Sequence, residues 1–212
     1  MRIVFLFYDG MTALDAVGPH EILCRLPEAQ VFRVAEQAGS IHTDSGLFLT
    51  ADYGIGDVSS ADVLLIPGAG NANTLRAQPE MLAWVNAIHQ STTWTTSVCT
   101  GSLILGAAGL LNGLKATSHW AALDRLSAWG AEPVQARIVE SGKIITAAGV
   151  SAGIDMALML AAKIAGQAVA ERLQLGIEYD PDPPFNVGSP EKADPTVCEA
   201  LRTHLVNGFE KF

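Results

Sequence analysis

The sequence predicts an α/β three-layer sandwich, with a mostly parallel central sheet and helices on both faces. Short apolar runs alternate with longer helical patterns along the chain, as in layered α/β folds. The run at 63–66 is apolar at every position, which is typical of a strand buried on both faces of a parallel sheet. We find no internal repeat and expect one domain over 1–212.

The first half of the chain contains two strand-to-helix units, two further strands and a hairpin. The opening strand stops at an Asp-Gly turn signal, and the run at 63–66 stops abruptly at a loop, 67–70. A proline begins the next helix at a position where its missing N–H costs nothing. We expect strands at 3–7, 31–36, 63–66 and 93–98, a hairpin through 41–53, and helices at 14–26 and 79–90.

The second half continues the same alternation. The helix after the strand at 93–98 is built of small apolar residues, which suits close packing on a sheet. Five of the ten prolines follow Tyr179, so the chain should run extended over the surface at 180–195 before a last helix. We expect strands at 137–140 and 143–146, and helices at 100–111, 119–129 and 152–164.

Composition excludes several classes of protein. Hydrophobic residues make up 49% of the chain and charged residues 17%, so it can bury enough surface to fold. A net charge of -9 opposes binding to nucleic acid. No apolar run reaches the ~18 residues of a membrane span, and the amino-terminal run is too short for a signal peptide. Three widely spaced cysteines argue against a disulfide framework. We expect a cytoplasmic protein.

Cys99 is the candidate nucleophile. It lies between a strand and a helix in Ser-Val-Cys-Thr-Gly, the small-residue context of a nucleophile elbow. Unpaired N–H groups at a helix start stabilise an anion, so the thiol pKa should fall below its ordinary value of ~8.5. The alternative is a buried structural cysteine. Cys24, in a helix on an apolar stripe, and Cys198, near the surface tail, are interpreted as structural.

Asp15 is the candidate acid/base. It stands among apolar residues after the first strand, and loops at the carboxyl ends of neighbouring strands converge in doubly wound sheets. Asp15, the loop 67–70 and Cys99 should therefore meet. The alternative is that Asp15 only caps its helix.

Four further residues are weaker candidates for the site. Gly68 and Gly70 would let the backbone approach a ligand, with N–H groups placed for a developing charge. Thr100 either hydrogen-bonds the substrate or caps its helix, and His119 either acts in the site or caps and packs. The five histidines lack metal-ligand spacing, and no Walker or dinucleotide-binding motif is present. We expect no metal and no cofactor.

Six motifs together resemble the isonitrile hydratase (isocyanide hydratase) family of the ThiJ/PfpI superfamily. That superfamily has a flavodoxin-like, class I glutamine amidotransferase-like fold. The resemblance covers about residues 3–190. The motifs are Leu-Asp-x-x-Gly-Pro at 14–19, Ile-Pro-Gly at 66–68, Ser-Val-Cys-Thr-Gly-Ser at 97–102, Ala-Thr-Ser-His-Trp at 116–120, Gly-Val-Ser-Ala-Gly-Ile-Asp at 149–155, and Glu-Tyr-x-Pro-x-Pro-Pro-Phe-Asn at 178–186.

The resemblance implies a homodimeric enzyme without a cofactor that hydrates isocyanides to N-substituted formamides. It assigns Cys99 as nucleophile, Asp15 as acid/base and Thr100 as an assisting polar group. Val17 and Ile154 are expected in an apolar lining for a small neutral substrate. Asp15 and Thr100 stand where the protease-like branch usually has Glu and His, which disfavours protease activity. Ala69 departs from the usual Pro-Gly-Gly. Its N–H can still donate to the substrate, as expected for Gly68 and Gly70, but Ala69 would be strained if its position needed a positive φ.

The sensor domains of AraC-type transcription regulators share nearly the same motifs. In those domains the pocket binds a ligand without turning it over. Such regulators continue into a helix-turn-helix domain after the Pro-rich stretch, whereas this chain ends at Phe212. We therefore expect a hydratase, with a ligand-sensing domain as the alternative.

Overall fold

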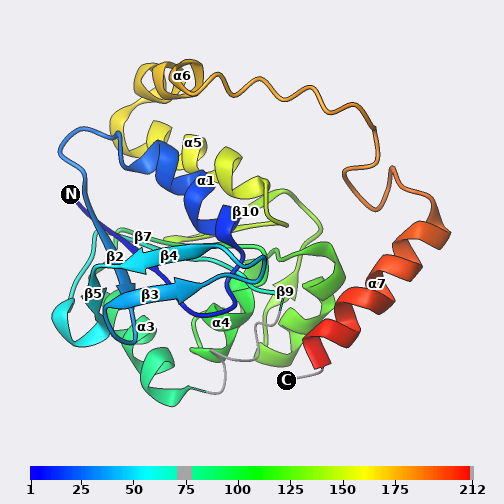
Figure 1. Ribbon diagram of the computed structural model, residues 1–212, viewed down its shortest axis with the longest axis horizontal. Coiled ribbons are helices and arrows are strands. Elements are labelled where there is room, and N and C mark those ends of the chain that lie inside the picture. The colour runs from blue at the N-terminus through cyan, green and yellow to red at the C-terminus, as the bar shows by residue number, and fades with distance from the viewer. Residues whose placement is uncertain (71–77, 211–212) are drawn as a thin grey trace.

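The computed structural model describes residues 1–70 and 78–210. A seven-stranded sheet forms the centre of the protein (Figure 1). The strands of this sheet lie in the order β10-β11-β7-β6-β1-β2-β5, and every neighbouring pair is parallel except β10 and β11. The predicted fold class is confirmed. The strands are β1 (Arg2–Leu6), β2 (Gln30–Ala35), β5 (Tyr53–Gly54), β6 (Val63–Ile66), β7 (Trp94–Val98), β10 (Ile138–Ser141) and β11 (Ile144–Ala147).

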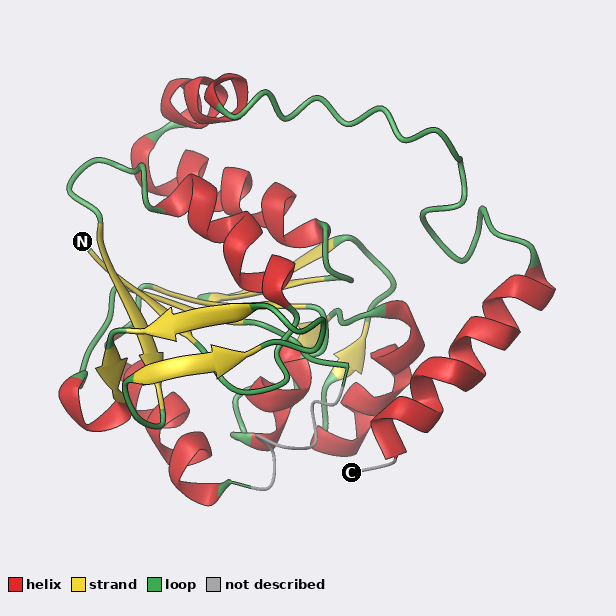
Figure 2. Cartoon of the chain, in the orientation of Figure 1, coloured by secondary structure: helices red, strands yellow, loops and turns green. Residues whose placement is uncertain are grey.

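Helices cover both faces of this sheet (Figure 2). One layer holds α1 (Ala13–Leu23), α5 (Ala152–Ala165) and α6 (Gln167–Gly176). The other holds α3 (Pro79–Ser91), α4 (Gly101–Ala107), the 3-10 helix η2 (Trp120–Trp129) and, against η2, α7 (Pro195–Glu210). The remaining elements are a 3-10 turn, η1 (Ile55–Asp57), and the short strands β3 (Gly39–His42), β4 (Phe48–Ala51), β8 (Lys115–Ala116) and β9 (Glu132–Pro133).

Small residues allow α1 and α5 to pack unusually close. A Cβ on Gly18 would lie 2.9 Å from Cγ1 of Ile154, and one on Gly153 would lie 3.1 Å from Cγ of Pro19. The first distance is shorter than real Cβ contacts and the second is tighter than most of them, so larger side chains would push against the facing helix. The glycines in two of the sequence motifs therefore set the distance between these helices.

Several elements differ from those predicted. The hairpin is limited to β3 and β4, because β5 leaves it to pair with β2 in the central sheet. The helix after Cys99 ends at Ala107, shortly before Gly109 adopts a φ of 78°. The helix expected at 119–129 is a 3-10 helix. The helix α6 and the strands β8 and β9 were not anticipated.

No helix among the described residues is long and apolar enough to cross a membrane.

The order of the strands brings three loops to one edge of the sheet. The strand β6 lies between β1 and β7 and is parallel to both, so their carboxyl ends are adjacent. The chain leaves β1 toward α1 and Asp15, leaves β6 at Pro67, and leaves β7 at Cys99. The fold therefore gathers the three sequence-predicted parts of the site.

Candidate active site

Cys99 occupies a strained turn between β7 and α4. Its φ is 58°, a left-handed conformation that costs a residue with a side chain about 1–3 kcal/mol. Its N–H lies within hydrogen-bond distance of the carbonyls of Ala147 and Ala148, and its carbonyl accepts from the hydroxyls of Ser102 and Ser118. These bonds hold the turn in place. This is the geometry of a nucleophile elbow.

Gly101 is required because β6 passes directly beside the turn. A Cβ at this position would lie 2.2 Å from the carbonyl oxygen of Ile66, a distance that no side chain tolerates. The glycine of the Cys-Thr-Gly motif therefore allows β6 to pass close to the elbow.

The sulfur of Cys99 lies among hydrogen-bond donors. The backbone N–H groups of Thr100 and Val150 and the Thr100 hydroxyl lie near the sulfur, and each lowers its pKa. Burial has the larger effect: the side chain is 5% exposed, and burial followed by the nearby Asp15 raises the thiol pKa well above its ordinary value. The expectation of a lowered thiol pKa is wrong for the resting site, because desolvation outweighs the donors.

Asp15 is fully buried on α1 beside this sulfur. Burial raises its pKa from 3.8 to about 7, while the hydrogen bond from the Gly68 N–H and the nearby Cys99 thiol lower it. Its Oδ2 accepts the Gly68 N–H at 2.8 Å. Its Oδ1 has no partner of regular hydrogen-bond geometry among the described residues. This oxygen can therefore exchange a proton with the thiol.

The helix-capping interpretation of Asp15 is not supported. The residue lies inside α1, and Thr12 is the residue before the helix. Among the described residues, the Asp15 side chain accepts its one regular hydrogen bond from the loop after β6 and makes none with its own helix.

The loop after β6 positions Asp15 and Thr100. The Ala69 N–H donates to Oγ1 of Thr100 at 2.8 Å, and that hydroxyl lies 2.8 Å from the Ala69 carbonyl. Thr100 does not cap α4 with its side chain. In the resting site the Gly68 N–H is therefore bonded to Asp15 and the Ala69 N–H to Thr100. These N–H groups were expected to stabilise a developing charge on the substrate, but they position the two side chains instead.

The room available for side chains explains which residues of the loop 68–70 are glycine. Gly68, Ala69 and Gly70 all avoid a positive φ, so Ala69 is not strained. A Cβ on Gly68 would lie 2.5 Å from the Thr100 nitrogen and 2.9 Å from Oδ2 of Asp15, whereas one on Gly70 would meet nothing among the described residues. Gly68 thus permits close approach within the protein, and Gly70 is unconstrained.

His119 caps η2. Its Nδ1 accepts the Ala121 N–H at 3.2 Å, and burial lowers its pKa. Its ring packs against Gly149, where a Cβ would lie 2.6 Å from Cδ2. Of the two interpretations, capping and packing is the one that these contacts support.

Sequence reasoning missed two contributors to the site. Val150, with a φ of 27°, supplies an N–H to the sulfur from the junction of β11 and α5. Tyr8 donates its hydroxyl to the Pro67 carbonyl at 2.8 Å, and its pKa is raised by burial and then by the charges of Asp15 and Cys99. The sequence does contain a signal for Val150. The residue lies at a strand-to-helix junction, between β11 and α5, and β11 is the neighbour of β7 in the sheet.

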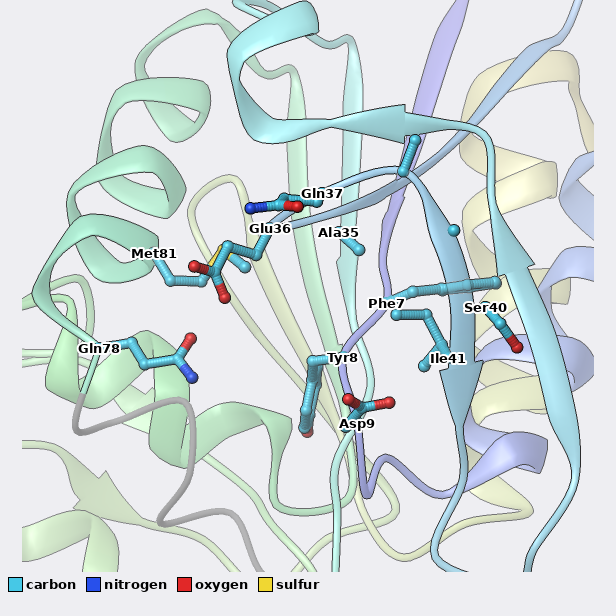
Figure 3. A pocket seen from close by; sticks show the side chains of 12 residues that line it. Phe7, Tyr8, Asp9, Ala35, Glu36, Gln37, Ser40, Ile41, Gln78 and Met81 are labelled. Carbon is cyan, nitrogen blue, oxygen red and sulfur yellow. The ribbon is translucent and has the colours of Figure 1, made fainter.

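Neither Val17 nor Ile154 lines the cavity that lies beside the site. Val17 is exposed on the outer side of α1, and Ile154 fills the contact with Gly18. A cavity of about 400 Å³ lies on the side of Tyr8, over the carboxyl ends of β1 and β2 (Figure 3). Its lining includes Asp9 and Glu36, so this space is more polar than the apolar lining expected for the substrate.

Cys24 and Cys198 lie outside the site. Cys24 is the residue after α1 rather than inside it, partly exposed beside Arg25. Cys198 lies on α7, near the Pro190 carbonyl. The described residues contain no group of three or more His, Cys, Asp or Glu side chains that could hold a metal ion.

The three-layer fold, together with a cysteine on an elbow beside a buried carboxyl group, places this chain in a class of α/β proteins with a cysteine nucleophile elbow. The DJ-1/PfpI family model matches residues 1–163, and this chain belongs to the DJ-1/PfpI family.

Individual relatives agree with this assignment. The chain is 39% identical to the isonitrile hydratase of Pseudomonas putida over 202 residues, which are 95% of this chain and 89% of that protein. It is 28% identical to the HTH-type transcriptional regulator CdhR of Pseudomonas aeruginosa over 78% of this chain and 51% of the regulator. A ThiJ/PfpI family protein from Pseudomonas syringae has a crystal structure that matches with a TM-score of 0.94 at 41% identity, covering 97% of this chain and 86% of that one.

Proposed function

We propose that this protein hydrates isocyanides to N-substituted formamides, with Cys99 as nucleophile and Asp15 as acid/base. The observation that carries the proposal is the pair itself: a thiol on an elbow beside a buried carboxyl whose pKa is about 7. The similarity to the isonitrile hydratase of Pseudomonas putida over 95% of this chain supports the choice of substrate.

The first step forms a bond between sulfur and carbon. A proton passes from the Cys99 thiol to Asp15, which leaves a thiolate held by the N–H groups of Thr100 and Val150 and by the Thr100 hydroxyl. The thiolate attacks the terminal carbon of R–N≡C. Asp15 then returns the proton to that carbon, which gives the thioimidate R–N=CH–S–Cys99 and an Asp15 carboxylate.

The second step consumes water. The Asp15 carboxylate takes a proton from water as the hydroxyl adds to the thioimidate carbon, and the nitrogen receives that proton. The hydroxyl proton of this adduct then returns to Asp15 as the C–S bond breaks. The products are R–NH–CHO and the thiolate, so one water is consumed and the site is restored without a metal or cofactor.

We also propose that the chain works as a homodimer in the cytoplasm. The net charge of -9 favours neither nucleic acid nor a membrane surface as a partner.

The test is turnover of several unhindered alkyl and aryl isocyanides by the reduced protein, with formamide followed by mass spectrometry. We expect formamide from wild type and none from Cys99→Ala. Cys24→Ser is the matched control, since it removes a thiol outside the site. Absence of formamide with every isocyanide would overturn the proposal.

A ligand-sensing domain is the second candidate, favoured by the similarity to the regulator CdhR. A sensor would bind an isocyanide or a related small molecule without releasing product. Saturable binding without turnover would select this function.

A further inference from the structure

The backbone carbonyl of Cys99 accepts two side-chain hydrogen bonds. The Ser118 hydroxyl donates to it at 3.1 Å, and the Ser102 hydroxyl donates to it at 3.2 Å. Both serines are buried, with exposed fractions of 2% and 0%, so bulk water does not compete for these bonds. Each serine belongs to one of the six sequence motifs, at 97–102 and at 116–120. The hydration steps described above use neither side chain.

Contacts on both sides hold Ser118 in place. Before it, the Thr117 N–H donates to Oγ1 of Thr146 on β11 at 2.9 Å, and the Thr117 hydroxyl donates to the Ala136 carbonyl at 2.8 Å. After it, His119 caps η2. The segment between β8 and η2 is therefore anchored on the sheet and on a helix, and Ser118 reaches the elbow from a fixed position.

Ser102 reaches the same carbonyl from the first turn of α4. Its hydroxyl bonds to the residue three places back along the chain, a local pattern that serine side chains often adopt. A carbonyl oxygen has two lone pairs, so it can accept from both hydroxyls at once. The two donors come from different segments, because Ser102 follows the elbow directly and Ser118 lies in a separate loop.

The peptide group that receives these bonds faces the sulfur with its other end. The Cys99 carbonyl and the Thr100 N–H belong to one peptide, and this N–H lies near the Cys99 sulfur and lowers the thiol pKa. Hydrogen bonds accepted by a carbonyl polarise the amide, which strengthens its N–H as a donor by about 10–30% per bond. A stronger donor stabilises the charged form of the group that it faces. The hydroxyl bonds therefore favour thiolate over thiol.

We propose that Ser102 and Ser118 are positioning residues that stabilise the Cys99 thiolate through the peptide between Cys99 and Thr100. Their hydroxyls hold and polarise the carbonyl end of this peptide, and its N–H end acts on the sulfur. This inference rests on the proposed function, in which that thiolate attacks the isocyanide, and it adds two residues on which formation of the thiolate depends.

Ser97 provides a matched control. It lies on β7 two residues before Cys99 and is fully buried. Its hydroxyl has no hydrogen-bond partner among the described residues. Ser97→Ala therefore removes a buried hydroxyl near the elbow without removing a bond to the Cys99 carbonyl, whereas Ser102→Ala and Ser118→Ala each remove one such bond.

The first test is the rate at which iodoacetamide labels Cys99 at pH 9, measured by peptide mapping with Cys198 as the internal reference. Only the thiolate reacts. We expect Ser102→Ala and Ser118→Ala each to slow labelling on the order of 2–4-fold, and the double variant on the order of 10-fold. Ser97→Ala should match wild type. Thermal melting checks that each variant is folded, and the single variants suffice if the double variant is not.

The sign of the change separates this role from a purely structural one. A turn that is only loosened would expose the sulfur, so labelling of Cys99 would become faster. Unchanged or faster labelling in either single variant would overturn the inference. Equal slowing in Ser97→Ala would overturn it as well, because that variant keeps both bonds to the carbonyl.

The second test follows the peptide itself by NMR, with isotope-labelled threonine and valine nitrogens. The N–H groups of Thr100 and Val150 both lie near the sulfur, but only that of Thr100 belongs to the peptide that the serines bind. A weakened hydrogen bond moves an amide proton upfield. In Ser118→Ala the Thr100 signal should therefore move upfield while the Val150 signal stays in place. An unmoved Thr100 signal, or an equal shift of both signals, would overturn the inference.

Neither test depends on turnover. If wild type produced no formamide from any isocyanide, the proposed function would fail, while the labelling rates and the amide signals would still decide the role of the two serines. If formamide forms but the single variants label as fast as wild type, the inference fails and the proposed function stands.

Discussion

The backbone N–H of Gly68 donates to Oδ2 of Asp15 at 2.8 Å, and this bond ties the loop after β6 to α1. The next residue of the loop, Ala69, bonds in turn to the Thr100 hydroxyl. One turn of chain thus fixes both polar side chains that accompany Cys99. The loop positions the acid/base rather than receiving the substrate's developing charge.

The first prediction concerns this loop. Gly68→Ala would place a methyl group 2.5 Å from the Thr100 nitrogen and 2.9 Å from Asp15 Oδ2. Since a displacement of about 1 Å at a reacting group can cost on the order of 10²-fold in rate, we expect turnover to fall by about that factor. Steady-state formamide production measures it.

Gly70→Ala is the matched control for the loop. Its new methyl group would meet no described residue within 4 Å, and the φ of Gly70 is not positive, so turnover should stay within about twofold of wild type. Equal losses in the two variants would show that the close approach at Gly68 is unimportant.

The second prediction concerns thiol reactivity. Burial raises the pKa of Cys99 and leaves its side chain 5% exposed, so iodoacetamide should label it more slowly than Cys198 at pH 7.5. Its labelling rate should still be rising with pH at pH 9, because little thiolate is present below that value. Peptide mapping after partial alkylation measures both rates. Preferential labelling of Cys99 at pH 7.5 would contradict the raised pKa.

The third prediction concerns stability and pH. The pKa of Asp15 is about 7 in the folded protein against 3.8 for the ordinary group. Folding therefore favours the protonated form, and the stability that this form gives below about pH 4 is lost as pH rises toward 7. Asp15→Asn has no such loss. Its free energy of unfolding relative to wild type should rise by about 2–3 kcal/mol between pH 5 and pH 8, at ~1.4 kcal/mol per pKa unit.

Urea denaturation of both proteins at the two pH values measures this difference. Comparing the variant with wild type at each pH cancels the titration of all other groups. A difference that does not change with pH would mean that Asp15 is ionised at little cost in the folded protein.

The placement of the site could be predicted from the sequence, while its electrostatics could not. The apolar run at 63–66 and the Thr-rich segment at 93–98 are both predicted as strands. The meeting of the residues after them with Asp15 follows from the rule that parallel strands end at one edge. The direction of the Cys99 pKa shift depends on how completely neighbouring elements cover the sulfur. Val150 contributes a backbone N–H near the Cys99 sulfur. Every residue except proline has such a group, so no pattern of side chains predicts this contribution.

Other elements escaped prediction because tertiary contacts determine them. The two residues of β5 are a strand only through their pairing with β2. The helix α6 packs against α5 although few of its residues are buried, so its apolar periodicity is weak.

The last prediction concerns Asp15 in catalysis. Asp15→Asn retains an oxygen for the Gly68 N–H, but the amide can neither accept the thiol proton nor deliver one to the isocyanide carbon. Turnover should therefore fall on the order of 10²–10⁴-fold, the usual worth of positioned acid/base catalysis. Asp15→Glu restores the acid but lengthens the side chain by one methylene within a fully buried site, so it should not restore wild-type activity.

Steady-state turnover of one isocyanide measures both variants, and thermal melting confirms that they fold. The pH dependence separates a chemical role from a structural one. Wild-type kcat should change with an apparent pKa near that of Asp15, about 7, and the residual activity of Asp15→Asn should lack this transition. Near-wild-type turnover by Asp15→Asn would show that the proton comes from elsewhere, and water would be the next candidate because His119 already spends its Nδ1 on the cap of η2.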